Sequence, residues 1–485
     1  MELVFAIVIP FVVVLLCGWF RFKPQLNVRP IPALALGVVI AGCVFGHDFF
    51  HISGGPIPIT LDRVLLVGLV VLFGALYLFG REDLRSLNKA DWTILALIAV
   101  LGFSTVTHDF RMMKNMPASR LLFFNLLPVT LYVVLKTSRL KREDLKFIAI
   151  VLGVFGFYLA ATGIAEIKEL TALVYPKYIM NSESVEFLGR GRGPFLNPVS
   201  NGIFQVVCFC CVLMWWPRAS GNTRFLLLAT ALVISIGVYA TLTRSVWLGL
   251  VAACGLFIWV PAPRHQKGAM VIAATVLAIA LFPVLGEKVF SFKRDKNVSQ
   301  ADMEQSAQLR PLFVIVAWKM FQDQPIAGVG FGQYARAKYP YLQDPYSNKP
   351  LWKTKSYMQH NVFLAYVTET GIIGLFCLLM MLLMMLRVSW KVWSDHSLDL
   401  WARQFGLLNI VLILNYSING MFHDVSIIPM QHMLMFFIFG LVNNVYSKPS
   451  AFQIEESPVV VKPAQPLQAN PRSMSGRRGA TPVGC

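Results

Sequence analysis

The sequence predicts an all-α polytopic membrane protein with about 12–13 transmembrane helices and a long, partly helical outer loop before the third-last helix. The chain of 485 residues is 56% hydrophobic and 14% charged, which is more apolar surface than a soluble domain can bury. Apolar runs of about 18–25 residues recur, and each can cross roughly 30 Å of hydrocarbon. Because the alternating pattern of barrel strands is absent, helices must satisfy the backbone in lipid.

Thirteen apolar runs define the predicted spans. The first, from Leu3 to Phe20, has neither a basic leader nor a small-residue cleavage site, so we expect a retained helix and not a signal peptide. The predicted spans are residues 2–20, 32–50, 61–80, 91–107, 120–136, 147–165, 198–216, 225–242, 245–261, 269–286, 361–386, 404–421 and 427–446.

Positive charge in the short loops predicts the orientation, because cytoplasmic loops are enriched in Lys and Arg. Clusters of these residues lie in the loops 21–29, 81–90, 136–146, 218–224, 264–267 and 387–403. The loops 47–60 and 422–426 contain none. The basic loops are therefore predicted to be cytoplasmic, with the N-terminus outside and the C-terminus inside.

The domain organisation follows from these spans. Residues 1–446 are predicted to form one transmembrane domain with outer loops at 166–197 and 287–360. Residues 447–485 are rich in Pro, Ser, Gly and Arg and lack apolar periodicity, which predicts a disordered cytoplasmic tail. The outer loops are also basic, in a chain whose formal net charge is +18. This charge predicts either an anionic partner at the headgroup level or simple attraction to anionic membrane lipid.

Two arginine motifs precede or join apolar runs. Arg244, in TLTRSVWLGL, lies in a hairpin too short to carry it far into water. Arg190 and Arg192, in GRGPFLNPVSNG, precede a helix that we expect Asn197 to cap, with Pro198 in its first turn. Both motifs fit a bidentate phosphate site, since a guanidinium fork and a helix N-terminus favour anions. The alternative is that these arginines only snorkel toward the membrane surface.

Arg310 opens the third motif, RPLFVIVAWKMFQDQPIAGVGFGQY. Its apolar residues predict a surface helix that stops at Pro325, followed by a tight turn at Gly328, Gly330 and Gly332. The glycines follow a helix and not a strand, so they are not a dinucleotide fingerprint. Arg310 is either a phosphate ligand or a solvated cation.

His360 and Asn361 begin the fourth motif, HNVFLAYVTETGIIGL, where a polar loop meets an apolar run. An imidazole at the membrane surface is suited to proton transfer. Glu369, nine residues further, is costly within apolar sequence unless it is paired or functional. The alternative is an interfacial histidine, with Glu369 serving only to neutralise a neighbouring Arg or Lys.

No metal centre is predicted. The cysteines lie nearly all inside apolar runs and show no CxxC spacing, which is typical of small buried hydrophobes. Three His-Asp pairs, at 47–48, 108–109 and 423–424, are all predicted at the outer face. Nothing in the linear spacing brings them together, and helix caps or water-facing polar ends are the preferred interpretation.

Along the chain the motifs follow one another as GRGPFLNP, TLTRSVWLG, R…W…DQPIAGVGFGQY and HN…ETGIIG. In this order and on this many helices, they resemble the O-antigen ligase and O-antigen polymerase superfamily, from Gly189 to Gly374. The resemblance implies a GT-C-like fold in a bacterial inner membrane and glycosyl transfer, at the periplasmic face, from undecaprenyl-pyrophosphate carriers. Arg192, Arg244 and Arg310 match the family's arginines, and with Arg190 they are expected to hold the diphosphate. His360 matches its loop histidine and is expected to act as general base, with Asn197, Asn361 and Glu369 in support.

The resemblance leaves the acceptor open. A lipid A–core acceptor would define a ligase, a second lipid-linked glycan a polymerase, and a Ser or Thr side chain a protein O-oligosaccharyltransferase; we favour the ligase type. No metal is expected, because fixed arginines can stabilise a departing diphosphate. No other cofactor and no nucleic-acid partner is expected either. A flippase for a lipid-linked saccharide is the alternative of another class, but most spans have uninterrupted apolar centres. A polysaccharide-binding scaffold would not need His360.

Overall fold

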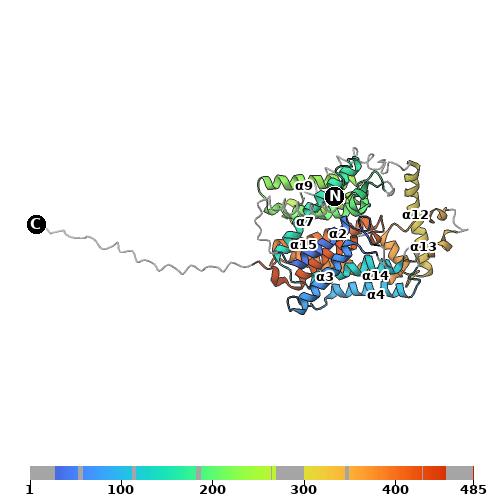
Figure 1. Cartoon of the computed structure of the whole chain (residues 1–485), viewed down its shortest axis with the longest axis horizontal. Coiled ribbons are helices and arrows are strands. Elements are labelled where there is room, and N and C mark those ends of the chain that lie inside the picture. Colours follow the sequence, from blue (N-terminus) through green and yellow to red (C-terminus); the bar gives the residue numbers. More distant parts are fainter. Residues whose placement is uncertain are drawn as a thin grey trace. The chain divides into compact units, whose positions relative to one another are not determined.

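The computed structural model describes residues 28–52, 58–111, 116–181, 187–263, 265–268, 300–343, 349–428, 430–454 and 484, without the side chains of 300–308. Within these ranges the regular structure is helical (Figure 1). The β pairing found there consists of two isolated bridges, Ile52–Ile59 and Leu398–Gln453. The predicted all-α polytopic class is confirmed.

Most of the helices are long and apolar. The longer helices are α2 (Pro30–Val44), α3 (Leu61–Leu78), α4 (Lys89–Val106), α6 (Leu127–Thr137), α7 (Arg142–Ile167), α8 (Pro198–Met214), α9 (Asn222–Ala240), α10 (Arg244–Trp259), α12 (Gln300–Asp323), α14 (Val362–Ser394), α15 (Leu400–Gly420) and α16 (Gln431–Ser447). The short elements include α5 (Pro117–Leu121), α13 (Tyr334–Ala337), the π-helical turn η1 (Leu122–Leu126) and the 3₁₀ turns η7 (Val425–Ile427) and η8 (Pro449–Phe452).

Helices coincide with eleven of the predicted spans, and the other two, 2–20 and 269–286, lie outside the described residues. Among the described residues, seven helical segments are long and apolar enough to cross a membrane, judged by length and composition: Leu61–Leu78, Lys89–Val106, Pro117–Thr137, Arg142–Ile167, Pro198–Arg218, Asn222–Ala240 and Val362–Ser394. The helices Pro30–Val44 and Arg244–Trp259 are apolar but shorter.

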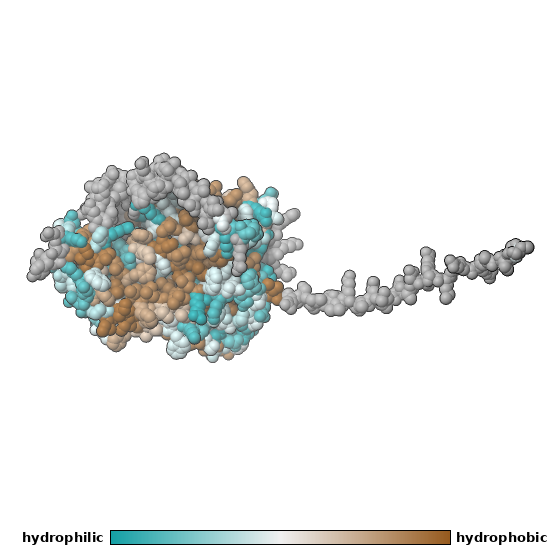
Figure 2. Space-filling model, turned by 180° about the vertical axis from the view of Figure 1, so that it is seen from behind, coloured by the Kyte–Doolittle hydropathy of each residue, from teal (hydrophilic) through white to brown (hydrophobic). Residues whose placement is uncertain are grey.

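The surface of the helical unit carries a broad hydrophobic area with hydrophilic residues on either side (Figure 2). On α3, Val67 and Val71 are 64% and 65% exposed, and on α9 Leu228 and Leu232 are 58% and 60% exposed. Apolar patches of this extent are rare on soluble proteins and mark surfaces that contact other molecules or lipid. These faces therefore suit contact with lipid.

The core of the unit lies around α8, α15 and α16, whose residues are buried on nearly every side. The segment Pro117–Thr137 is not a regular helix, because Pro128 lacks the N–H that would bond to the carbonyl of Phe124. The ring of His432 on α16 lies with its Nδ1 2.5 Å from that carbonyl oxygen. A side chain of α16 thus occupies the acceptor that the proline leaves open.

The basic loops that were predicted to share one side contact one another. The Arg139 guanidinium lies 2.9 Å from Asp83, joining loops 136–146 and 81–90, and Arg142 lies 3.1 Å from Asp399, reaching loop 387–403. The backbone N–H of Arg29 donates to Asp144 at 2.9 Å. These contacts support the predicted alternation of the helices, while the side on which each end lies stays a prediction.

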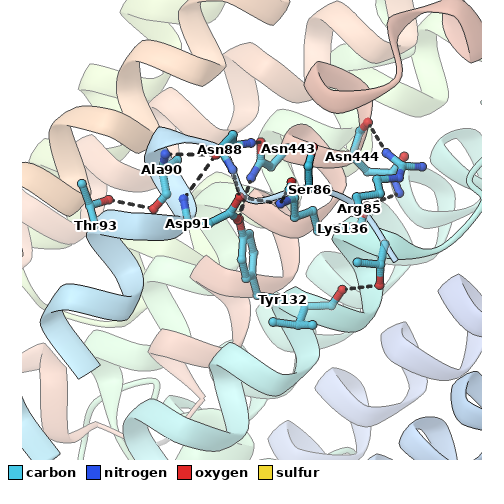
Figure 3. Close-up of polar contacts among 12 residues, drawn as sticks. Arg85, Ser86, Asn88, Ala90, Asp91, Thr93, Tyr132, Lys136, Asn443 and Asn444 are labelled. Carbon is cyan, nitrogen blue, oxygen red and sulfur yellow. Dashed lines mark hydrogen bonds and ion pairs between the residues drawn. The ribbon is translucent and has the colours of Figure 1, made fainter. Parts of the chain in front are cut away.

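A buried polar network fastens α4, α6 and α16 at this end (Figure 3). The ammonium of Lys136 pairs with Asp91, which also accepts a hydrogen bond from the hydroxyl of Tyr132. Asn443 donates to the Tyr132 hydroxyl and accepts from Asn88 at 2.7 Å. Each charge in this network is met by a partner from another helix.

The compact unit extends beyond the predicted boundary at residue 446. The turn η8 follows α16, the side chain of Phe452 is buried, and its carbonyl accepts the N–H of Asp399 at 2.7 Å. The unit therefore ends at Gln453. Of the predicted disordered tail, residues 455–483 and 485 lie outside the described residues.

Candidate active site

The site begins at His360, the last loop residue before α14. Its backbone is left-handed, with φ of 52°, and the next residue, Asn361, caps α14 by accepting the N–H of Leu364 at 3.0 Å. The amide of Asn361 also donates to the carbonyl of Met421 at 3.0 Å, which ties the loop to the end of α15. The residue as a whole is exposed, and its imidazole lies 5.5 Å from the Phe313 ring of α12, measured between centroids.

Arg310 and Lys338 lie close enough to His360 for their charges to act on the imidazole, and Arg244 acts in the same way on Arg310. We call Arg244, Arg310, Lys338 and His360 the cationic cluster. Desolvation by the surrounding protein is the main cause that lowers the pKa of His360, followed by the positive charges of Arg310 and Lys338. The pKa of Arg310 is lowered by burial and then by Arg244. The charges that shift these two groups are all positive.

Each member of the cluster comes from a different element. Arg244 begins α10, and Arg310 lies on α12, where its guanidinium carbon sits 5.4 Å from the centre of the Phe422 ring. Lys338 follows α13 and is buried, with its ammonium donating to the carbonyls of Thr354 and Tyr357. The fold thus brings together the motifs of Arg244, Arg310 and His360, which lie far apart along the chain.

Arg190 supports the turn that presents Arg244. Its guanidinium is buried and donates to the hydroxyl of Thr243 at 2.7 Å and to the carbonyl of Thr241 at 3.3 Å. The neighbouring N–H of Gly191 donates to the carbonyl of Ala240 at 2.9 Å. The GRGPFLNP motif therefore holds the α9–α10 turn in place. These contacts favour a positioning role for Arg190.

Arg192 lies in a buried ion pair. Its Nε donates to Glu166 of α7 at 2.7 Å, and another guanidinium nitrogen donates to the carbonyl of Ile179 at 2.8 Å. The backbone N–H groups of Arg192 and Gly193 donate to the second oxygen of the same carboxylate. These contacts fix the loop, and direct contact of Arg192 with a diphosphate stays a prediction. Asn197 caps α8 as expected, accepting from Val199 and Ser200 at 2.9 and 3.1 Å.

Glu369 has the neighbouring arginine that its apolar surroundings require. Its carboxylate lies 3.1 Å from the guanidinium of Arg120, and both side chains are buried. The second oxygen accepts the N–H of Gly332 at 3.0 Å. Asp424 lies close enough for the positive charge of Arg120 to lower its pKa, although burial of the carboxyl raises that pKa more.

The glycine turn fixes α12 to α14. Gly328, Gly330 and Gly332 all have positive φ, which confirms the predicted tight turn. The turn packs into a break in α14 at Gly371, itself at φ of 63° and ψ of −163°. There the N–H of Ile372 donates to the carbonyl of Pro325 at 2.9 Å. The helix that carries Arg310 is thereby fixed to the helix that follows His360 (Figure 1).

Sequence reasoning missed Lys338 and Arg120, and it considered Asp424 only as part of a His-Asp pair. The signal for Arg120 was present, because an acid such as Glu369 inside an apolar run requires a cation nearby. Lys338 had no such signal in a loop with many basic residues.

The His-Asp pairs do not assemble in the part of the chain that the structure describes. Within it, no group of three or more His, Cys, Asp and Glu side chains is placed to hold a metal ion. His47 stacks on His51 with ring centroids 4.0 Å apart, and His108 bonds through Nδ1 to the carbonyl of Ser104 at 2.9 Å. These contacts fit the interpretation of polar ends of helices.

The fold and the cluster define a class: a polytopic membrane protein with an anion-attracting site where a polar loop meets the helices. Residues 228–379 match the family described as O-Antigen ligase, which confirms the resemblance predicted from the sequence. The matched segment contains all four members of the cationic cluster as well as Glu369. Among curated proteins, none matches the chain significantly.

Proposed function

We propose that the protein is a membrane glycosyltransferase of the O-antigen ligase type. It transfers a glycan from undecaprenyl-pyrophosphate to a hydroxyl of lipid A–core or another glycan at the periplasmic face of a bacterial inner membrane. The observation that supports this proposal is the grouping of like charges, in which Arg310 and Lys338 act on His360 and Arg244 acts on Arg310. Like charges held together at a surface favour a bound anion, which would remove their mutual repulsion.

The arginines are assigned to the leaving group. As the bond between the anomeric carbon and the phosphate oxygen breaks, the diphosphate takes the electron pair and gains negative charge. Arg244 and Arg310 stabilise that charge through their fixed guanidinium groups, which suit phosphate geometry. This assignment needs no metal for the leaving group to depart. Arg190 holds the turn that presents Arg244, and Arg192 fixes the neighbouring loop through its ion pair with Glu166.

His360 is assigned to the acceptor. Its lowered pKa keeps the imidazole neutral at neutral pH, as a general base requires. The acceptor hydroxyl oxygen attacks the anomeric carbon and passes its proton to the imidazole. The positive charge that then forms on the imidazolium lies next to the departing diphosphate, which compensates it. Direct displacement of this kind inverts the anomeric configuration.

The test is transfer of a glycan in liposomes that contain the full-length protein, a lipid-linked donor and a lipid A–core acceptor. We expect His360→Ala to lower the transfer rate by about 10²–10⁴-fold, the usual contribution of a general base. His51→Ala, at another exposed histidine, is the matched control and is expected to transfer at the wild-type rate. Wild-type transfer by His360→Ala would remove the general-base assignment.

A second acceptor separates the related activities. Replacing lipid A–core by a second lipid-linked glycan tests for polymerase activity, and a Ser/Thr peptide tests for protein O-glycosylation. The proposal predicts transfer to lipid A–core; transfer only to one of the other acceptors would retain the chemistry of the site and overturn the ligase assignment.

A further inference from the structure

A cavity of about 360 Å³ lies at the end of α14 opposite to His360. It is formed where α4 begins and where α14 and α16 end, and its lining includes Asn88, Lys89, Trp92, Arg387, Lys391 and Tyr446. Of the residues that line it in the described part of the chain, three are basic and none is acidic. An anion is therefore the ligand that the charges of this cavity favour.

Two of these cations retain their hydrogen-bonding capacity. Lys89 and Arg387 are exposed, and no ion pair or hydrogen bond joins either side chain to another described residue. Lys391 lies over the ring of Tyr446, 5.4 Å from its centre, and its ammonium is 3.3 Å from the hydroxyl. A guanidinium and two ammonium groups therefore face one cavity with donors available for a ligand.

A neighbouring cavity of about 280 Å³ provides the contrast. It is also partly basic, but Arg139 there pairs with Asp83 at 2.9 Å, and Arg85 donates to the carbonyls of Asn444 and Ser138. Its arginines are thus used within the protein, as part of the contacts that Figure 3 shows around Arg85. The cavity lined by Arg387 has no such internal partner for its arginine among the described residues.

The depth of the cavity relates it to the membrane. The stretch of α14 from Gly371 to Leu386 has no charged residue and measures about 24 Å at 1.5 Å per residue, which is most of the roughly 30 Å of hydrocarbon in a bilayer. Trp92 and Trp390, 61% and 54% exposed, lie near its far end, where aromatic residues mark the membrane–water boundary. Leu87, Met384 and Val388 add apolar side chains to the lining. The cavity therefore suits an amphiphile.

We propose that this cavity binds the phosphate headgroup of an anionic phospholipid in the leaflet opposite to His360. Arg387, Lys89 and Lys391 contact the phosphodiester, and the apolar lining contacts the first part of the acyl chains. Basic cavities between transmembrane helices are suited to such headgroups. The proposal does not depend on the glycosyltransferase assignment.

The test measures lipid binding to the purified full-length protein in a neutral detergent by native mass spectrometry. We expect phosphatidylglycerol to bind more tightly than phosphatidylcholine with the same acyl chains. Arg387→Gln and Lys391→Gln are each expected to weaken phosphatidylglycerol binding by about fivefold, the effect of one lost cation near a phosphate. Binding of phosphatidylcholine is expected to stay unchanged in both variants.

The matched control is Arg81→Gln, which removes an exposed arginine near the same end of the unit but outside the cavity. It is expected to bind phosphatidylglycerol like the wild type, and Arg387→Lys is expected to retain most of the affinity. Equal binding of the two lipids, or equal losses in Arg81→Gln and Arg387→Gln, would overturn the proposal. Displacement of phosphatidylglycerol by millimolar inorganic phosphate would instead identify a site for soluble phosphate.

Discussion

The two ends of the helical unit use charge in opposite ways. Around Asp91, the buried cation Lys136 meets a carboxylate, and amides and hydroxyls from three helices complete the network (Figure 3). Around His360, the positive charges of Arg310 and Lys338 act on the imidazole, and that of Arg244 acts on Arg310. A buried charge that is paired with an opposite charge therefore stabilises the architecture, whereas like charges held close together favour an anion from outside the protein.

The largest effect is expected on the free energy of unfolding, when the ion pair between Lys136 and Asp91 is broken. Lys136→Met leaves Asp91 buried without its cation, and breaking such a pair costs about 3–5 kcal/mol. We expect a fall of this size in the free energy of unfolding, measured by titration of the detergent-solubilised protein with a denaturing detergent. The transfer rate per folded molecule is expected to be unchanged.

The double variant Lys136→Met with Asp91→Leu sharpens this prediction. Removing both partners leaves no unpaired charge, so the loss of stability should be smaller than in Lys136→Met alone. A double variant that is as unstable as the sum of both single variants would contradict the interpretation of the network as a compensated pair.

The next largest effect is expected on the transfer rate, when a member of the cationic cluster is changed. In Arg244→Lys we expect the transfer rate to fall by about 10²–10³-fold, because an ammonium does not reproduce the guanidinium fork at the leaving group. The half-buried side chain remains positively charged, so the free energy of unfolding should change little. Initial rates in liposomes and the same unfolding titration measure both quantities. A loss of stability comparable to that of Lys136→Met would place Arg244 with the architectural charges instead.

The difference between the ends also explains what the sequence could predict. Local patterns located eleven helices, the caps Asn197 and Asn361 and the turn at Gly328–Gly332, since these depend on neighbours within a few residues. They also selected Arg244, Arg310 and His360, whose motifs are distinctive. The partners of charges were not predictable, because Arg120 and Glu369 are 249 positions apart and meet only through packing. The effect of Lys338 on His360 was not predictable either, because packing of the loop brings the two side chains together.

The smallest effect concerns Lys338, whose charge lowers the pKa of His360. As a general base, His360 must be neutral, so the transfer rate should fall as the pH drops through its pKa. In Lys338→Met that pKa rises toward its ordinary value, and the acidic limb of the pH–rate profile should move upward by less than one unit, which corresponds to less than about 1.4 kcal/mol. At higher pH the imidazole is neutral in both proteins, so the midpoint of the limb, and not the plateau, is the relevant measurement. Lys353→Met, in the same loop, is the control and should leave the midpoint in place; an unmoved midpoint in Lys338→Met would separate Lys338 from the catalytic histidine.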